Sequence, residues 1–284
     1  MQSAETVLDV LRERGRRGLP LDELYRQLFN PQLYLVAYGR LYSNKGAMTP
    51  GPDAETADGM TLAKIGSIID ALRHERYRCK PVKRTYIPKK NGKRRPLGLP
   101  SWSDKLVAEV VRLLLEAYYE PQFSARSHGF RPGQGCHTAL REVAVAWTGT
   151  TWFIEGDISG CFDRLDRQVM LEALGENIHD NRMLRLVSNM LAAGYLEDWV
   201  WNPTLSGVPQ GGGIPDPVQY LPASVGCFCR EGSAAGIQPR GAQGAQPCLP
   251  KGAGRTRQSP PPWRYRSRAV AATKAAQPTY PGCM

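Results

Sequence analysis

The chain has 284 residues, 42% of them hydrophobic, and a formal net charge of +11. No run of 18 or more apolar residues occurs, so we expect no membrane span. The first six residues lack the basic-then-apolar order of a signal peptide, and we expect a cytoplasmic protein. Residues 216–284 carry +7 and residues 1–215 only +4, so the charge says little about the folded part.

The first hundred residues predict helices followed by a β-hairpin. Residues 4–42 repeat leucine at helical spacing around a break at Gly18-Leu19-Pro20, and residues 61–76 place apolar side chains three and four apart. Residues 44–51 between them form a turn-rich loop. Residues 81–99 alternate basic and apolar side chains, with Asn91-Gly92 as a tight turn, which is typical of a hairpin.

The next hundred residues predict a helix that begins at a cap, Ser103 or Asp104. Further helices are expected near residues 135–147, 166–174 and 181–191, with one strand ending at Asp157 and a short one at 199–201. This order of helices and hairpins predicts an α+β domain. The residues that the first of these helices should bury are Val107, Val110, Val111, Leu114, Leu115 and Tyr118.

Residues 216–284 have a different composition. They hold ten of the 23 prolines and only scattered large apolar residues. Such a segment buries too little apolar surface to offset its chain entropy, so we expect it to be disordered.

Asp157 is the strongest candidate for metal binding. It follows the apolar, β-prone residues 151–154, and Phe162 comes five residues later. A carboxylate at the end of a strand suits Mg²⁺, which takes oxygen ligands and keeps part of its shell for phosphates. The simpler alternative is an aspartate that forms a turn or caps a helix.

The predicted hairpin is the second candidate site. Its cations are suited to a triphosphate, arginine through its planar fork and lysine as a point charge. The alternative is a solvated edge hairpin whose lysines prevent pairing with other chains. The glycine-rich segment 207–213 offers backbone donors but is weak evidence alone, and His128, in a loop between helices, is expected to be structural. The cations are Lys83, Lys89, Lys90, Lys93, Arg94 and Arg95.

Six segments in order resemble the reverse transcriptases encoded by bacterial group II introns, which also act as splicing maturases. They are residues 44–51 (NKGAMTPG), 87–100 (IPKKNGKRRPLGLP), 124–133 (SARSHGFRPG), 136–140 (CHTAL), the Asp157 segment and 207–212 (GVPQGG). The resemblance covers roughly residues 30–213. It implies an RNA-directed DNA polymerase shaped like a right hand, with a maturase role in intron splicing and mobility.

The resemblance also implies an organisation of the chain. Residues 1–80 match a helical N-terminal extension that grips template and intron RNA, and residues 81–215 match the fingers and part of the palm. The implied partners are group II intron RNA, an RNA template with a DNA primer, and deoxynucleoside triphosphates (dNTPs).

Individual residues take roles from the resemblance. Asp157 matches the first catalytic metal ligand, with the Ile158 carbonyl beside it, and Phe162 matches the aromatic that favours deoxynucleotides. Gln210 matches the residue near the nascent base pair. Around the incoming dNTP, the matching cations are Lys83, Lys89 and Arg95.

The implied chemistry is phosphoryl transfer with two Mg²⁺ ions, which needs more than one carboxylate. The family supplies the others in a Tyr-Ala-Asp-Asp hairpin, and this tetrapeptide is absent from the sequence. We therefore expect the chain to be catalytically incomplete. The alternatives are an RNA-binding module that retains no polymerase activity and a product that does not fold.

The tail offers an explanation. Read one base out of frame, permitted codons for residues 216–226 spell Ile-Leu-Ser-Asn-Ile-Tyr-Leu-His-Arg-Leu, which resembles the family's next helix. We therefore interpret residues 216–284 as the product of a frameshift near residues 213–215, although a genuine alternative tail stays open.

Overall fold

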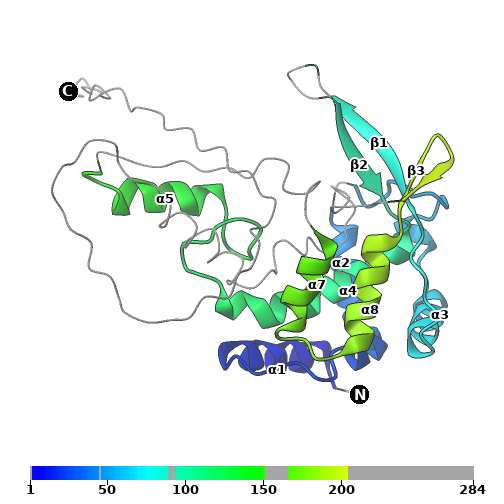
Figure 1. Cartoon of the computed structure of the whole chain (residues 1–284), viewed down its shortest axis with the longest axis horizontal. Coiled ribbons are helices and arrows are strands. Elements are labelled where there is room, and N and C mark those ends of the chain that lie inside the picture. Colours follow the sequence, from blue (N-terminus) through cyan, green and yellow to red (C-terminus); the bar gives the residue numbers. More distant parts are fainter. Residues whose placement is uncertain (1, 45, 89–91, 93, 151–165, 204–284) are drawn as a thin grey trace, which may run out of the picture.

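The computed structural model describes residues 2–44, 46–88, 92, 94–150 and 166–203. In these parts helices form a body from which two β-hairpins project (Figure 1). The α+β class expected from the sequence is confirmed. The helices are α1 (Ala4–Arg16), η1 (Tyr25–Phe29), α2 (Pro31–Tyr42), η2 (Ala57–Gly59), α3 (Leu62–Arg73), α4 (Trp102–Tyr119), η3 (Glu120–Gln122), α5 (Cys136–Ala146), α7 (Arg167–Gly175) and α8 (Asn181–Ala192). The strands are β1 (Val82–Pro88), β2 (Arg94–Leu99), β3 (Tyr195–Glu197) and β4 (Val200–Asn202).

Helix α4 is the centre of the helical body. It is apolar on nearly every side, as a fully buried helix must be, and packs against α1 and α2. All six residues that the sequence predicted to be buried are buried. The predicted cap was wrong: the helix begins after Ser101, whose hydroxyl accepts a 3.1 Å hydrogen bond from the Asp104 amide. Ser103 instead lies in the first turn and binds Glu55.

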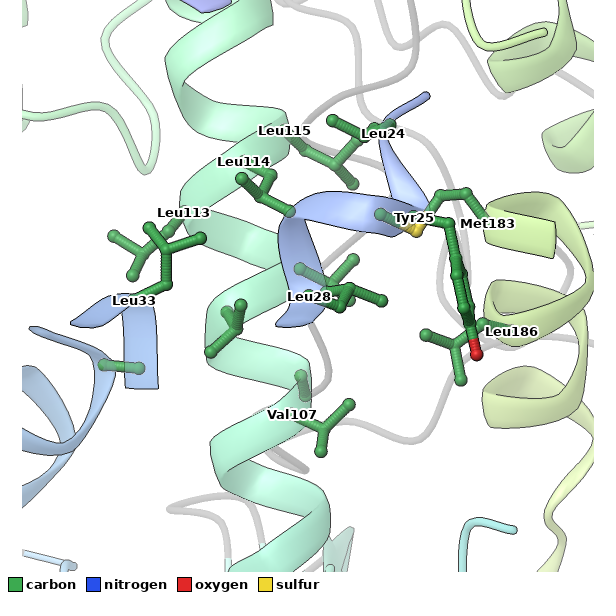
Figure 2. Close-up of a cluster of buried hydrophobic side chains, with 14 of the residues drawn as sticks. Leu24, Tyr25, Leu28, Leu33, Val107, Leu113, Leu114, Leu115, Met183 and Leu186 are labelled. Carbon is green, nitrogen blue, oxygen red and sulfur yellow. The ribbon is translucent and has the colours of Figure 1, made fainter. Parts of the chain in front are cut away.

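The core brings segments from both ends of the described chain onto α4. Figure 2 shows η1 lying across α4, with Leu28 against that helix and Tyr25 facing Met183 and Leu186 of α8. Leu28 and Met183 are fully buried. Apolar burial of this kind, at roughly 25 cal/mol per Å², is the main force that holds the helices together.

Asp180 links the N-terminal helices to α8. One carboxylate oxygen caps α8 by accepting from the Arg182 amide at 3.0 Å, and the other accepts from the Tyr25 amide at 2.8 Å. A short parallel bridge between Leu21 and Ile178 lies nearby. The segment that follows the predicted break near Gly18 therefore contacts the start of α8 before α2 begins.

The four strands form one sheet in the order β2-β1-β3-β4. The hairpin expected at residues 81–99 is confirmed as the antiparallel pair β1–β2, which closes at Pro88 and Arg94. Gly92 in its turn has φ of +76°, the left-handed region that glycine favours. Strand β3, which the sequence did not predict, pairs in parallel with β1 and in antiparallel with β4.

The remaining predicted helices are confirmed as α5, α7 and α8. Asp166 begins α7 as its cap and accepts hydrogen bonds from the next turn. Helix α5 lies apart from the helical body in Figure 1, and none of its residues is buried. The strand expected to end at Asp157 and the tail at 216–284 both lie outside the described residues.

Candidate functional site

The structure describes two of the residues to which the sequence assigned site roles. Lys83 lies on β1, and Arg95 lies on β2, where its backbone pairs with Ile87. The others lie outside the described residues, and their roles stay predictions. They are Lys89, Asp157, Ile158, Phe162 and Gln210.

The two cations of β1 lie on opposite faces of the sheet. Lys83 is paired in register with Leu99 on one side and with Leu196 on the other, and it is exposed. No carboxylate of the described residues forms an ion pair with it. Its ammonium is therefore available to an anionic ligand.

Arg84, by contrast, is held within the protein. Its guanidinium lies over the Tyr195 ring, 3.8 Å from the centroid, and 3.6 Å from a carboxylate oxygen of Glu197. Tyr86 donates a hydrogen bond to the same carboxylate, which raises the pKa of its phenol. Arg84 thus fixes β3 against β1. The sequence analysis missed this cluster because its partners lie on the unpredicted strand β3.

A buried carboxylate attaches the β1–β2 hairpin to α4. Asp104 accepts hydrogen bonds from the Tyr77 hydroxyl at 2.7 Å, the Lys80 amide at 3.0 Å and the Ser101 hydroxyl at 2.7 Å. Its burial raises the pKa of this carboxyl, although the hydrogen bonds act in the opposite direction. Because Lys80 lies two residues before β1, Asp104 fixes where the hairpin leaves the helical body.

Residues 46–51 of the predicted loop are packed onto the same end of α4. The indole of Trp102 donates to the Ala47 carbonyl at 2.7 Å, and the Lys105 ammonium donates to the Thr49 carbonyl at 2.9 Å. Gly51 lies so close to the backbone that a Cβ there would come within 2.3 Å of the Pro100 carbonyl oxygen. The loop and the end of β2 are therefore in direct backbone contact.

Two acidic residues after this loop tie it to neighbouring elements. Asp53 forms a 2.7 Å ion pair with Lys80. Glu55 receives hydrogen bonds from Lys64 of α3 at 2.6 Å and from the Ser103 hydroxyl at 2.8 Å. Burial would raise the pKa of Glu55, but these hydrogen bonds outweigh it and hold the pKa below its ordinary value.

The segment 124–133 is held by its own arginine. The Arg131 guanidinium donates to the Glu120 carboxylate at 2.9 Å and to the carbonyls of Ser124 and Ser127 at 2.7 and 2.9 Å. His128 is hydrogen-bonded to Thr138 and Glu142 of α5. The structural role expected for His128 is confirmed.

Neither a metal centre nor a membrane segment is found in the parts of the chain that the structure describes. There, no group of three histidine, cysteine, aspartate or glutamate residues has the arrangement that a metal ion needs. No helix among these residues combines the length and apolar composition needed to cross a bilayer.

Comparison with known proteins identifies the domain. Residues 87–214 match the family model of reverse transcriptases (RNA-dependent DNA polymerases). The chain is also similar in structure to a chain of the partial Cas6-RT-Cas1–Cas2 complex, with a TM-score of 0.48 and 17% sequence identity, over 76% of this chain and 36% of that one.

Several relatives have intron-related names. The group II intron-encoded protein LtrA of Lactococcus lactis subsp. cremoris is 50% identical over 190 residues, which are 66% of this chain and 32% of that protein. An uncharacterized 91 kDa protein in the cob intron of Schizosaccharomyces pombe is 42% identical over 208 residues, 72% of this chain and 26% of that protein. The protein YkfC of Escherichia coli K12 is 35% identical over 206 residues, 69% of this chain and 54% of that protein.

The present chain thus spans about a third of the length of LtrA. Residues 87–214 thus match the reverse transcriptases, and over about two thirds of its own length the chain is similar to a group II intron-encoded protein.

Proposed function

We propose that this chain is part of an RNA-directed DNA polymerase that serves a group II intron, with a maturase role in its splicing. Among the described residues, the observation that carries the proposal is the contrast between Lys83 and Arg84. Neighbouring cations on one strand have different surroundings: one is neutralised inside the protein, and the other is left for a ligand. Phosphates are the ligand that such a cation on a basic hairpin suits.

The division of the chain follows from the family. We assign residues 81–215 to the fingers and part of the palm, and residues 1–80 to an N-terminal extension that contacts template and intron RNA. Residues 216–284 are assigned to an out-of-frame tail. The packing of the 44–51 loop and the β1–β2 hairpin on α4 supports a rigid base for the fingers.

The incoming dNTP would lie between the fingers and the palm. Lys83, Lys89 and Arg95 bind its triphosphate, Phe162 packs against the sugar and rejects a 2′-hydroxyl, and Gln210 lies beside the nascent base pair. The protein then acts mainly by positioning, which is the larger part of catalysis in phosphoryl transfer.

The donor atoms at residues 157 and 158 suit Mg²⁺. A carboxylate of Asp157 and the carbonyl of Ile158 are both oxygen ligands, which this ion prefers. When bound, the metal supplies activation of the primer 3′-hydroxyl and stabilisation of the leaving pyrophosphate. One aspartate cannot hold two such ions, so we expect this chain alone to bind its substrates without extending a primer.

Salt-dependent binding of a labelled RNA template–DNA primer duplex tests the proposal. We expect the affinity to fall steeply with salt. When no dNTP occupies the site, the Lys83 ammonium is free to contact a backbone phosphate, so Lys83→Ala should reduce the slope of log K against log salt by roughly one. Arg185→Ala is the matched control, because Arg185 of α8 is also exposed but forms an ion pair with Glu75, which follows α3. A flat salt response in the wild-type chain would refute nucleic-acid binding.

Primer extension on poly(rA)/oligo(dT) with Mg²⁺ tests whether the chain is complete. We expect no synthesis above that of Asp157→Ala. Synthesis that this substitution abolishes would instead show a complete polymerase site in this chain.

The second candidate is an RNA-binding module without polymerase activity. The absence of a Tyr-Ala-Asp-Asp sequence from the chain favours it. It predicts equal affinity for structured RNA with and without a primer and dNTPs. A polymerase fragment should instead bind the template–primer more tightly when the complementary dNTP is present.

A further inference from the structure

The β3–β4 hairpin exposes two tryptophans. Trp199 at its turn is 79% exposed, and Trp201 on β4 is 55% exposed. Large aromatic side chains stabilise a protein or a complex most when they are buried. Two exposed ones on one small hairpin therefore indicate a binding surface.

The local structure gives no reason for a tryptophan at position 199. Asp198 and Trp199 both have positive φ, 50° and 64°, between the paired residues Glu197 and Val200. This is the geometry of a two-residue type I′ turn, which favours Asp-Gly or Asn-Gly. A bulky residue is disfavoured there, and within the described residues the indole makes no hydrogen bond or ring contact.

Trp201 has a fixed place on the same sheet face as Lys83. Lys83 pairs with Leu196, and Leu196 pairs with Trp201. Paired residues of neighbouring strands project to the same side, so the side chains of Lys83 and Trp201 lie on one face, and their backbones are two strand spacings, or about 10 Å, apart. The Trp201 indole also donates to the Ala193 carbonyl at 3.4 Å, and a Cβ at Gly194 would come within 2.7 Å of its nitrogen.

Charge decides which ligand fits this face. Residues 82–99 carry seven basic side chains and no acidic one. The β3–β4 hairpin carries two acidic residues, Glu197, which is paired with Arg84 on the opposite face of the sheet, and Asp198 in the turn. The two hairpins project side by side from the helical body (Figure 1). Cations next to exposed aromatic rings match a polyanion that also has flat apolar faces. Single-stranded nucleic acid has both, because its unpaired bases stack on aromatic side chains while its phosphates bind cations.

We propose that the β3–β4 hairpin is a stacking platform for single-stranded RNA, with unpaired bases on Trp199 and Trp201 and the phosphate backbone toward Lys83. The inference rests on the proposed nucleic-acid binding and adds to it the strand state of the ligand and the residues that hold its bases. A base-paired duplex would gain little from the platform, because its bases are already stacked on each other.

The test uses the full chain and a labelled single-stranded RNA of 16 nucleotides, with fluorescence anisotropy over a salt series. Trp199→Gly removes the ring and leaves Asp-Gly, the sequence that the turn prefers, so the melting temperature should stay or rise. We expect it to weaken single-strand binding about tenfold without changing the salt slope. Trp199→Phe should restore most of the affinity.

Two controls separate stacking from other effects. Trp147→Ala removes an exposed indole beyond the end of α5, 49% exposed, and should leave the affinity unchanged. Lys83→Ala should lower the affinity and also reduce the salt slope by about 0.7, because it removes a phosphate contact on a single strand.

The outcomes distinguish the inference from the proposed function. If Trp199→Gly binds single-stranded RNA like the wild type while Lys83→Ala still reduces the slope, the platform is wrong and nucleic-acid binding stands. If Trp199→Gly weakened binding of double-stranded RNA as much as binding of single-stranded RNA, the platform would also be wrong. It would likewise be wrong if this variant changed the sedimentation of the protein but left its RNA binding unaltered. If the wild type shows no salt-dependent binding, both proposals fail.

Discussion

Trp102 donates a 2.7 Å hydrogen bond from its indole nitrogen to the carbonyl oxygen of Ala47, which fastens the 44–51 loop to the first turn of α4. Two residues along, in the same turn, Asp104 accepts a hydrogen bond from the Lys80 amide just before β1. Two segments that the family resemblance singled out are therefore positioned by the same end of one buried helix. Substitutions at this end of α4 should therefore affect both segments.

Removing the Trp102 hydrogen bond should destabilise the protein modestly. Trp102→Phe keeps a buried aromatic ring but leaves the Ala47 carbonyl without its donor, at a cost of about 1 kcal/mol in the free energy of unfolding. Urea denaturation measures this cost, and hydrogen exchange should quicken in residues 44–51 first. Faster exchange spread evenly over all helices would contradict a local role.

Gly51→Ala should be more damaging, because its new methyl group would meet backbone atoms that cannot move aside. A Cβ there lies 2.3 Å from the Pro100 carbonyl oxygen and 2.8 Å from the Ser101 Cα. We expect a loss of about 2 kcal/mol or more. The matched control is Gly66→Ala on α3, where a Cβ meets nothing within 4 Å, and where the substitution should stabilise the helix by about 0.5–1 kcal/mol. Equal effects at both sites would contradict the argument.

Glu55 should make stability depend on pH under acidic conditions. Its folded-state pKa is lowered, so its contribution is present above the unfolded pKa of about 4.3 and is lost as the pH falls through the folded value. Glu55→Gln should therefore cost about 2 kcal/mol at pH 7, and this difference from the wild type should shrink below about pH 4. Urea unfolding at several pH values measures it. A difference that stays constant with pH would show that the charge of Glu55 is not what matters.

Arg131→Lys should loosen residues 124–133. A single ammonium cannot reproduce the planar fork that binds Glu120 together with the carbonyls of Ser124 and Ser127. We expect a loss of about 2 kcal/mol, with faster proteolysis in this loop. Arg126→Lys is the control, since the Arg126 side chain is 81% exposed and its replacement should change stability by less than about 0.5 kcal/mol.

The helices were predictable because each carries a long apolar stripe that local spacing reveals. Strand β3 was missed because it has three residues, and because Asp198-Trp199 does not resemble the sequence of a type I′ turn. The cap of α4 was misplaced by two or three residues, since several polar residues near Ser101 satisfy the same local rule. Which of these residues caps the helix depends on their contacts with residues far away in the sequence.

The candidate site was predictable only as a set of residue types. The sequence proposed Lys83 as a ligand-binding cation and assigned no role to Arg84. The structure shows that Arg84 is paired with Glu197, which lies more than a hundred residues further along the chain. No local pattern carries that information. The metal ligand Asp157 and the residues around it lie outside the described parts and remain predictions.

The parallel pairing of β1 with β3 has a consequence for how the protein is made. Val82 leaves the ribosome long before its partner Tyr195, by on the order of ten seconds at ordinary rates of translation. Throughout that interval one edge of β1 has no neighbour and could recruit a strand from another nascent chain. The dense positive charge of residues 82–99 opposes such pairing by repulsion. The cations that we assign to phosphate binding in the finished protein therefore also act as its protection against aggregation during synthesis.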